Sequence, residues 1–475
     1  MDSDEKFPLR SRQNEELAEE YLQTFPESDR QRMREYLAAA RKLADLVNDS
    51  SSEPFYIHSC RIFGTKKTRQ SLFKAVISPT FEARTFGELI DEVRIAADKL
   101  NRLDIFKYVD VLLDACEDGF APPEALDMVI AVEEKPRYWI RTGTEIGNDA
   151  GSANISLNIR NVFGGAESLE AFMSANTQTS HVFEFCLAKP INGNPDYKID
   201  TSAFSLTKNN QIYSSHDEIL RGAALRWRGR SRLGLHELSY GITWRQVSNI
   251  AQNATLSIRE SAGHSLKSSI TNTFTRDVRD DVMLPSKGYY LKLAQEFAGI
   301  GGDVDFFKHE LESQVNFHLG KGFILSASLR NGLLYPLDGQ RSKISDRFFL
   351  GGAQSIRGFR LNGIGPREDK KDSLGGDLYV AGGASLFTPL PRLGNYPVKG
   401  HFFVNGGNLL QLNQRARLRT NINQLTKTPS ISAGVGVVYR SSIVRLEVNF
   451  CLPLITTATD KVKKGLQLGL GINFW

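Results

Sequence analysis

The feature that most constrains this chain is a repeated alternation of apolar and polar residues, which runs from about residue 137 to the last residue. In the segment VRLEVNF, residues 444–450, the even positions are apolar and the odd positions are polar. The segment LQLGLGINF, residues 466–474, alternates in the same way. Successive side chains of a β-strand point to opposite faces, so the pattern predicts strands with one apolar face.

Two architectures fit such strands. A soluble sandwich turns the apolar face to a core, whereas a membrane barrel turns it to lipid. We count about sixteen such segments, separated by Gly, Asn, Asp, Pro or Ser turns, which is typical of an even-numbered antiparallel outer-membrane barrel. Aromatic residues near segment ends suit interfacial belts: Tyr138, Trp139, Trp227, Trp244, Tyr289, Tyr290 and Trp475. We therefore predict a 16-stranded transmembrane β-barrel over residues 136–475.

The residues before the barrel divide into two regions. Residues 1–52 are polar and charged, and apolar residues at three- and four-residue steps after Ser28 predict an N-terminal helical extension. Residues 53–135 predict a small α+β domain in the order strand, helices, strand, strand. In that domain Leu89, Val93, Ala96, Ala97 and Leu100 share one helix face.

Composition and motifs exclude several classes of protein. The net charge of +5 is mild for 475 residues and no run of like charges stands out, so nucleic acid is not an expected partner. Cys60, Cys116, Cys186 and Cys451 are too far apart to indicate a metal site or a disulfide framework. No stretch approaches 18 apolar residues, and the start MDSDEKFPLR has no apolar targeting core. Because motifs for nucleophiles, zinc and phosphate are also missing, we expect no enzyme, cofactor or metal.

One connection is unlike the other turns. It runs from about Pro336 to Ser373, between the eleventh and twelfth predicted strands, and is far longer than a hairpin loop. It is rich in glycine yet keeps Ile356, Phe359 and Leu361, which a disordered loop would rarely do. We expect it to fold into the lumen, where Arg357 can reach polar wall residues.

The architecture and this loop together resemble a known family. The tetrapeptide Ile356, Arg357, Gly358, Phe359 follows strand eleven, and the outer-membrane β-barrel assembly superfamily carries a V/I-R-G-F motif at the tip of this loop, inside the barrel. Residues 53–135 resemble a polypeptide-transport-associated (POTRA) domain. A single such domain without a signal peptide is similar to the central barrel subunits of the mitochondrial sorting and assembly machinery (SAM).

The resemblance also implies partners for the loop arginine. In the family an acidic residue on strand thirteen, within an F-x-D-x-G pattern, typically pairs with it. Here the sequence FVNGG offers Phe403, Asn405 and Gly407 as candidate partners. Asn405 would supply a neutral acceptor instead of a salt bridge.

Glycines in the first and last strands predict a weak seam, since glycine weakens a strand. The hypothesis is a lateral gate whose first strand contains Trp139, Ile140, Arg141, Thr142, Gly143, Thr144, Glu145 and Ile146. Its last strand contains Gln467, Leu468, Gly469, Leu470, Gly471, Ile472, Asn473 and Phe474.

The function that the resemblance implies is folding and insertion of β-barrel precursors into the mitochondrial outer membrane. A client's C-terminal β-signal would pair with the gate, and the POTRA domain would lie in the intermembrane space. Implied partners are precursor clients, peripheral SAM subunits on the cytosolic face, membrane lipid and a second copy in a homodimer. A channel for polypeptides or solutes is the alternative, and a lipid-modifying enzyme has no recognisable nucleophile to support it.

Overall fold

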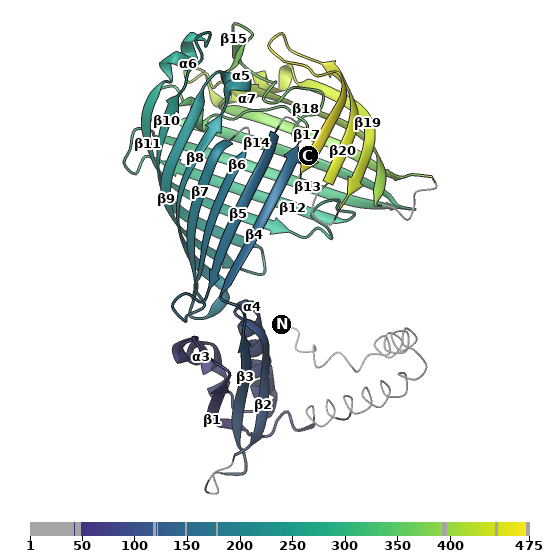
Figure 1. The fold of residues 1–475 in the computed structure, drawn as a ribbon. Coiled ribbons are helices and arrows are strands. Elements are labelled where there is room, and N and C mark those ends of the chain that lie inside the picture. Colours follow the sequence, from purple (N-terminus) through teal and green to yellow (C-terminus); the bar gives the residue numbers. More distant parts are fainter. Residues whose placement is uncertain are drawn as a thin grey trace. The chain divides into compact units, whose positions relative to one another are not determined.

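The computed structural model describes residues 42, 49–116, 120, 122–147, 150–176, 179–391, 397–441 and 445–471 (Figure 1). The predicted N-terminal helix lies almost entirely outside these residues. Two compact units share the chain, one up to Pro136 and one from Arg137 onward apart from two turns. Each is described by itself.

The first unit is a three-stranded sheet covered by helices. Its elements are β1 (Tyr56–Phe63), α3 (Gln70–Ile77), a 3-10 turn η2 (Ser78–Phe81), α4 (Phe86–Arg102), β2 (Phe106–Ala115) and β3 (Ala125–Glu134). Strand β3 lies in the middle, parallel to β1 and antiparallel to β2. Helix α4 begins at Thr85, whose hydroxyl accepts a hydrogen bond from the Glu88 backbone N–H. The helix buries Leu89, Ala96 and Leu100.

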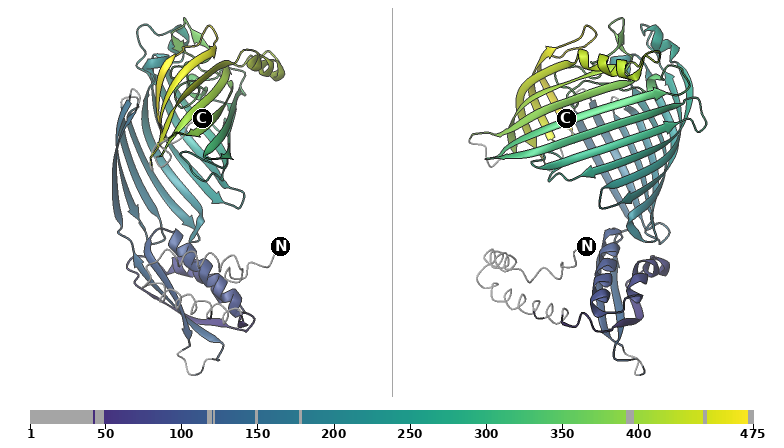
Figure 2. Two further views of the ribbon diagram at one scale, coloured as in Figure 1. Left: turned by 90° about the vertical axis from the view of Figure 1, so that its right-hand side faces the viewer. Right: turned by 180° about the vertical axis from the view of Figure 1, so that it is seen from behind.

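The second unit is one antiparallel sheet, and the described residues contribute sixteen strands to it (Figures 1 and 2). They are β4 (Tyr138–Gly147), β5 (Ala150–Arg160), β6 (Ser168–Asn176), β7 (Thr179–Ile191), β8 (Asn194–Asn209), β9 (Asp217–Arg230), β10 (Leu235–Ser248), β11 (Gly263–Asp277), β12 (Gly288–Ala298), β13 (Phe306–Gly320), β14 (Phe323–Pro336), β17 (Leu378–Pro389), β18 (Val398–Leu410), β19 (Ser430–Arg440), β20 (Arg445–Ile455) and β21 (Gly465–Gly471). Shorter elements lie between them: α5 (Gln211–Ser214), α6 (Leu256–Glu260), η3 (Ile344–Asp346), β15 (Arg367–Glu368), β16 (Asp372–Ser373) and α7 (Leu418–Lys427).

Sheet order follows chain order, from β4 at one edge to β21 at the other. Each strand pairs with its sequence neighbour, and β14 pairs with β17 across the long loop. The predicted sixteen antiparallel strands are confirmed. A ladder that would close the sheet between β4 and β21 is missing from the described residues, so both strands are edges there.

The exposure of side chains decides which way the apolar faces point. On β20 the apolar residues Leu446, Phe450 and Leu452 are 36%, 52% and 41% exposed. The polar residues between them are buried, with Glu447 at 0% and Asn449 at 2%. A soluble sheet protein would show the reverse, because exposing that many large apolar side chains to water is unfavourable. The outer face of this sheet is therefore suited to lipid.

Among the described helices, none is long and apolar enough to cross a membrane.

Candidate functional site: the buried loop motif and the two edge strands

The loop between β14 and β17 packs against the inner face of the sheet, and its tip is the most buried part. Ile356, Arg357 and Phe359 are 1%, 1% and 0% exposed. Ile356 and Phe359 join an apolar cluster with wall residues from β12, β13, β14, β17 and β18. The expectation that apolar residues fold the loop inward agrees with this packing for Ile356 and Phe359, whereas Leu361 is 46% exposed.

Arg357 forms a buried ion pair with Glu447 of β20. Its Nε and Nη2 atoms lie 3.0 and 2.9 Å from the same carboxylate oxygen, Oε2. Glu447 also pairs with Arg445, and its Oε2 accepts a hydrogen bond of 2.8 Å from the Asn449 side chain. Two buried cations and one buried carboxylate thus share a site on β20, where the loss of one partner would leave an uncompensated charge.

The three positions predicted to meet Arg357 lie near the motif, but none of them supplies the ionic partner. The Phe403 ring lies under the guanidinium, 5.2 Å from ring centre to Cζ. Asn405 reaches the motif indirectly: the Ser432 hydroxyl lies 2.7 Å from the Asn405 Oδ1 atom and also contacts the Arg357 carbonyl oxygen. The acidic acceptor therefore comes from β20, whereas the family pattern suggested the thirteenth strand, β18.

Glycines give the loop tip its close approach to the wall. Gly358 has φ +85°, a left-handed conformation, and a Cβ at this position would lie 2.9 Å from Ser432 Cβ. On β18, a Cβ on Gly407 would lie 2.7 Å from Ile356 Cδ1. Side chains at either position would push the motif away from β18 and β19.

The motif also contacts β21, the last described strand. The Gly358 N–H donates to Gln467 Oε1 at 2.9 Å, and Gln467 Nε2 donates to the Phe359 carbonyl at 3.3 Å. The segment just before β21 continues this contact, since the Lys463 amide donates to the Gly358 carbonyl at 2.8 Å. The loop and the last strand thus hold each other through both backbone and side chain.

Further anchors fix the rest of the loop around the wall. Arg245 of β10 and Asp346 of η3 form a buried ion pair of 2.6 Å. Near the other end of the loop, Asp372 accepts hydrogen bonds from the Ser215 hydroxyl at 2.6 Å and the Thr255 amide at 2.9 Å. The loop is thereby tied to β10 and to the connections that hold α5 and α6.

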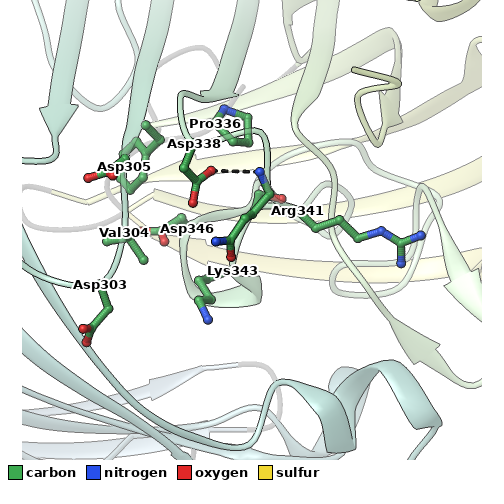
Figure 3. Close-up of a pocket in the computed structure, with 11 residues that line it drawn as sticks. Asp303, Val304, Asp305, Pro336, Asp338, Arg341, Lys343 and Asp346 are labelled. Atoms are coloured by element: carbon green, nitrogen blue, oxygen red, sulfur yellow. Dashed lines mark hydrogen bonds between the residues drawn. The ribbon is translucent and has the colours of Figure 1, made fainter. Parts of the chain in front are cut away.

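A small, partly open pocket lies where the loop leaves β14, between residues 303–306 and 336–346 (Figure 3). Its lining includes Asp303, Asp305 and Asp338 together with Arg341 and Lys343, and Figure 3 shows Arg341 extending away from the two aspartates of the β12–β13 loop. In the described part of the chain, no group of three or more His, Cys, Asp or Glu residues could hold a metal ion. The pocket is a polar junction between two loops.

The predicted first gate strand corresponds to β4. Residues 138–142 are exposed on both faces, and Trp139 is covered only in part by Arg141, whose Cζ lies 4.4 Å from the ring centre. In the pairing with β5, Gly143 lies opposite Asn154, and a Cβ on Gly143 would lie 2.7 Å from the Asn154 side chain. The side chains of Thr144, Glu145 and Ile146 lie outside the described residues.

The predicted last gate strand corresponds to β21, and Ile472, Asn473 and Phe474 lie outside the described residues. Gln467 and Gly469 face inward and are buried, whereas Leu466 and Leu468 are 64% and 43% exposed. Gly469 is the cross-strand neighbour of Glu447. A glycine presents no side chain beside that crowded carboxylate.

Sequence reasoning missed Glu447 and Ser432 as contacts of the motif, and it placed Gln467 in the gate without linking it to the loop. Glu447 could have been found as a charged residue on the polar face of VRLEVNF, the segment quoted for its alternation. The signals for Ser432 and for the role of Gln467 were weaker, because small polar residues are common on such a face.

Comparison with known proteins places this arrangement in context. Residues 161–474 match the Omp85 superfamily domain. The chain is 35% identical to a SAM50-like protein of Schizosaccharomyces pombe, over 91% of this chain and 94% of that protein. It is 36% identical to the human sorting and assembly machinery component 50 homolog, over 86% of this chain and 88% of that protein.

A solved structure has a similar fold. The crystal structure of BamA from Haemophilus ducreyi lacking POTRA domains 1–3 matches with a TM-score of 0.75. The match covers 88% of this chain and 84% of that chain at 16% identity. At that identity the likeness concerns the fold alone.

Proposed function

The chain belongs to the Omp85 superfamily and, within it, to the sorting and assembly machinery component 50 family, and from this we propose that it folds and inserts β-barrel precursors into the mitochondrial outer membrane. Membership supports a role in β-barrel assembly at an outer membrane. We propose in addition that the membrane is the mitochondrial outer membrane, that the seam opens as a gate, and that the clients are β-barrel precursors.

The observation that carries the proposal is the contrast between a buried loop motif on the inner face of the sheet and an edge strand, β4, on the other side of the seam. The loop motif is buried against β18 to β21, while β4 has no partner beyond β5 in the described sheet. An unpaired strand edge in lipid costs several kcal/mol per missing hydrogen bond, so a client strand that pairs there is strongly favoured. We propose that β4 accepts the client's C-terminal β-signal as an added strand.

The same arrangement argues against conduction as the main activity. A conducting pore needs an open lumen, whereas here the loop tip fills the space beside β20 and its arginine is 1% exposed. Template pairing at an edge needs no nucleophile, cofactor or metal, which agrees with a function that is not enzymatic. The α+β unit is proposed to be a POTRA domain in the intermembrane space, with peripheral SAM subunits on the cytosolic face and a second copy as a homodimer partner.

The proposal is tested by locking the seam. One cysteine is placed at each of Ile140 and Thr142 on β4 and paired in turn with cysteines at Leu466 and Leu468 on β21, in a chain whose Cys60, Cys116 and Cys186 are serine. Oxidation should block assembly of a labelled barrel precursor in isolated membranes, and reductant should restore it. The matched control is Thr142→Cys with Ile155→Cys, because these residues are already neighbours on β4 and β5.

Two results decide the matter. Loss of assembly at the seam pair, with full assembly in the control pair, supports a gate that clients use. Efficient crosslinking at the seam with undiminished precursor assembly would overturn the gate and favour a lumenal channel.

A further inference from the structure

Helix α7 lies in the connection between β18 and β19 and is unlike the other connections in composition. Residues 411–429 read QLNQRARLRTNINQLTKTP, with four cations and no acidic residue. The cations are Arg415, Arg417, Arg419 and Lys427. Figure 2 shows the helix at one end of the strands, projecting away from the sheet in the left view. The segment is therefore a positively charged element at the rim of the lipid-facing sheet.

One side of α7 is fixed to the sheet. Asn421 and Leu425 are 4% and 5% exposed, and the Asn408 side chain of β18 donates to the Leu425 carbonyl at 2.8 Å. The Asn421 side chain bonds the backbone of Asn413 in both directions, at 3.1 and 3.2 Å. These contacts hold the helix in one orientation.

A second apolar side of the helix is only partly covered by the described residues. Leu418 and Ile422 are 42% and 44% exposed, and they stand one turn apart. In the part of the chain that the structure describes, the four basic side chains have no hydrogen-bond or ion-pair partner. Arg415 and Arg417 make their hydrogen bonds through the backbone amide and carbonyl. An exposed apolar ridge beside unneutralised cations is the composition of a helix that lies in a membrane interface.

The neighbouring sheet surface has the same apolar character. Strand β19 starts shortly after α7, and its residue Ile431 pairs with Ile455 of β20, which is 49% exposed. Leu454 beside it is 56% exposed. The helix is thus followed in sequence by β19, which pairs with β20, a strand whose outer face is suited to lipid.

We propose that α7 is an interfacial helix that inserts Leu418 and Ile422 between lipids and binds anionic headgroups through its basic side chains. The occupant follows from charge and position: an anionic bilayer surface complements the cations and surrounds the rim of any membrane-spanning sheet. An acidic surface of a partner protein would use the same cations and is the competing outcome of the test. The proposal extends beyond client insertion and does not depend on the gate.

The test uses the full chain in lipid nanodiscs made of phosphatidylcholine alone or mixed with phosphatidylinositol, so that both membrane faces are accessible. Cys60, Cys116 and Cys186 are changed to serine, and the fully buried Cys451 is kept. An environment-sensitive fluorophore is attached at Ile422→Cys. The matched label position is Gln424→Cys, which is exposed and lies on the other side of the helix.

The proposal predicts a blue-shifted emission at position 422, quenched by spin-labelled lipid and enhanced by phosphatidylinositol, with a weaker response at position 424. Changing Arg417→Gln together with Arg419→Gln should lower the ratio of lipid-contacting to water-exposed probe roughly fivefold per charge, since each cation near an anionic surface contributes about that factor. Changing Lys370→Gln with Lys371→Gln, two exposed lysines in the β14–β17 loop, is the charge-matched control and should leave the ratio unchanged.

Two outcomes would overturn the proposal. A probe at 422 that remains in water in both kinds of disc would leave the helix as a surface for an acidic protein. Lipid contact that is equal with and without phosphatidylinositol would remove the headgroup part of the claim. Unchanged heat resistance of the folded barrel on gels shows in each case that the variants are folded.

Discussion

The two edge strands of the sheet are held in different ways. On β21 the inward residue Gln467 is 5% exposed and bonds Gly358 and Phe359 of the loop motif. On β4 the residues from Tyr138 to Thr142 are exposed on both faces, and its described ladder is with β5 alone. In the proposed mechanism, the last strand is therefore the fixed side of the seam and the first strand is the side that exchanges partners.

The largest expected effect comes from removing the charge that anchors the loop. Arg357→Met removes one of the two cations that pair with the buried Glu447 carboxylate. We expect this loss to destabilise the docked loop by about 3–5 kcal/mol. Amide exchange in β21 should then rise toward that in β4, and precursor assembly should fall. The checks are hydrogen exchange by mass spectrometry and an assembly assay in membranes.

The control for this change is Arg141→Met, which removes an exposed arginine from the other edge strand. It should leave the exchange of β21 and the docked loop unchanged. If both variants loosen β21 equally, the difference between the edges does not depend on the loop.

A smaller effect is expected from the glycine that brings the loop tip to the wall. Gly358→Ala adds a Cβ 2.9 Å from Ser432 Cβ at φ +85°, so it should cost about 1–3 kcal/mol and shift the barrel's unfolding to lower temperature. Gly465→Ala has φ +104° with nothing within 4 Å of the added Cβ, and thus carries the backbone strain without the clash. Equal thermal shifts in the two variants would show that contact with Ser432 is unimportant.

The direct link between loop and last strand can be cut without touching a charge. Gln467→Leu leaves the buried Gly358 N–H without its acceptor, at a cost of about 1–3 kcal/mol. We expect faster amide exchange in β21 with the Arg357 ion pair intact. Gln314→Leu removes a similarly buried amide from β13, where its partners are Asn316, Ser326 and the Arg279 guanidinium, and should leave β21 protected.

The smallest expected effect is a dependence on pH at the far end of the loop. The Ser257 N–H donates to the Glu368 carboxylate at 3.0 Å and holds the pKa of Glu368 below its ordinary value of 4.5. A depressed folded pKa means that the stabilisation is complete above pH 4.5 and is lost as pH falls through the lower folded value. Limited proteolysis of the loop should therefore increase below pH 4.5, and Glu368→Gln should flatten this response. A loop that is cleaved at the same rate across this range would show that the contact is unimportant.

Much of the fold could be predicted from local pattern. Alternation in segments such as residues 444–450 identified strands, and the count of segments identified a sheet of sixteen. The apolar residues Ile356 and Phe359 indicated that a long loop would be packed and not free. These conclusions depend only on residues close in sequence, because the side chains of a strand alternate between its two faces.

The partners of the motif could not be predicted in the same way. Alternation puts Glu447 on the polar face, but meeting Arg357 also requires the register of β20 and the depth to which the loop folds, over a separation of 90 residues. The family pattern pointed to Asn405 on β18, and in this chain Ser432 connects Asn405 to the motif while the charge is met two strands later. Open edges are also invisible in the sequence, since glycine content shows weakness without showing which strand has a partner.

The most direct test of the difference between the edges asks which strand a client touches. A precursor with a cysteine in its C-terminal strand is arrested during insertion, and disulfides are sought to Ile140→Cys on β4 or to Leu468→Cys on β21, two exposed apolar positions. Adducts at position 140 that form earlier and in larger amount than at position 468, and that disappear when the client's β-signal is altered, are the predicted result. Adducts confined to position 468 would contradict a fixed last strand and an accepting first strand.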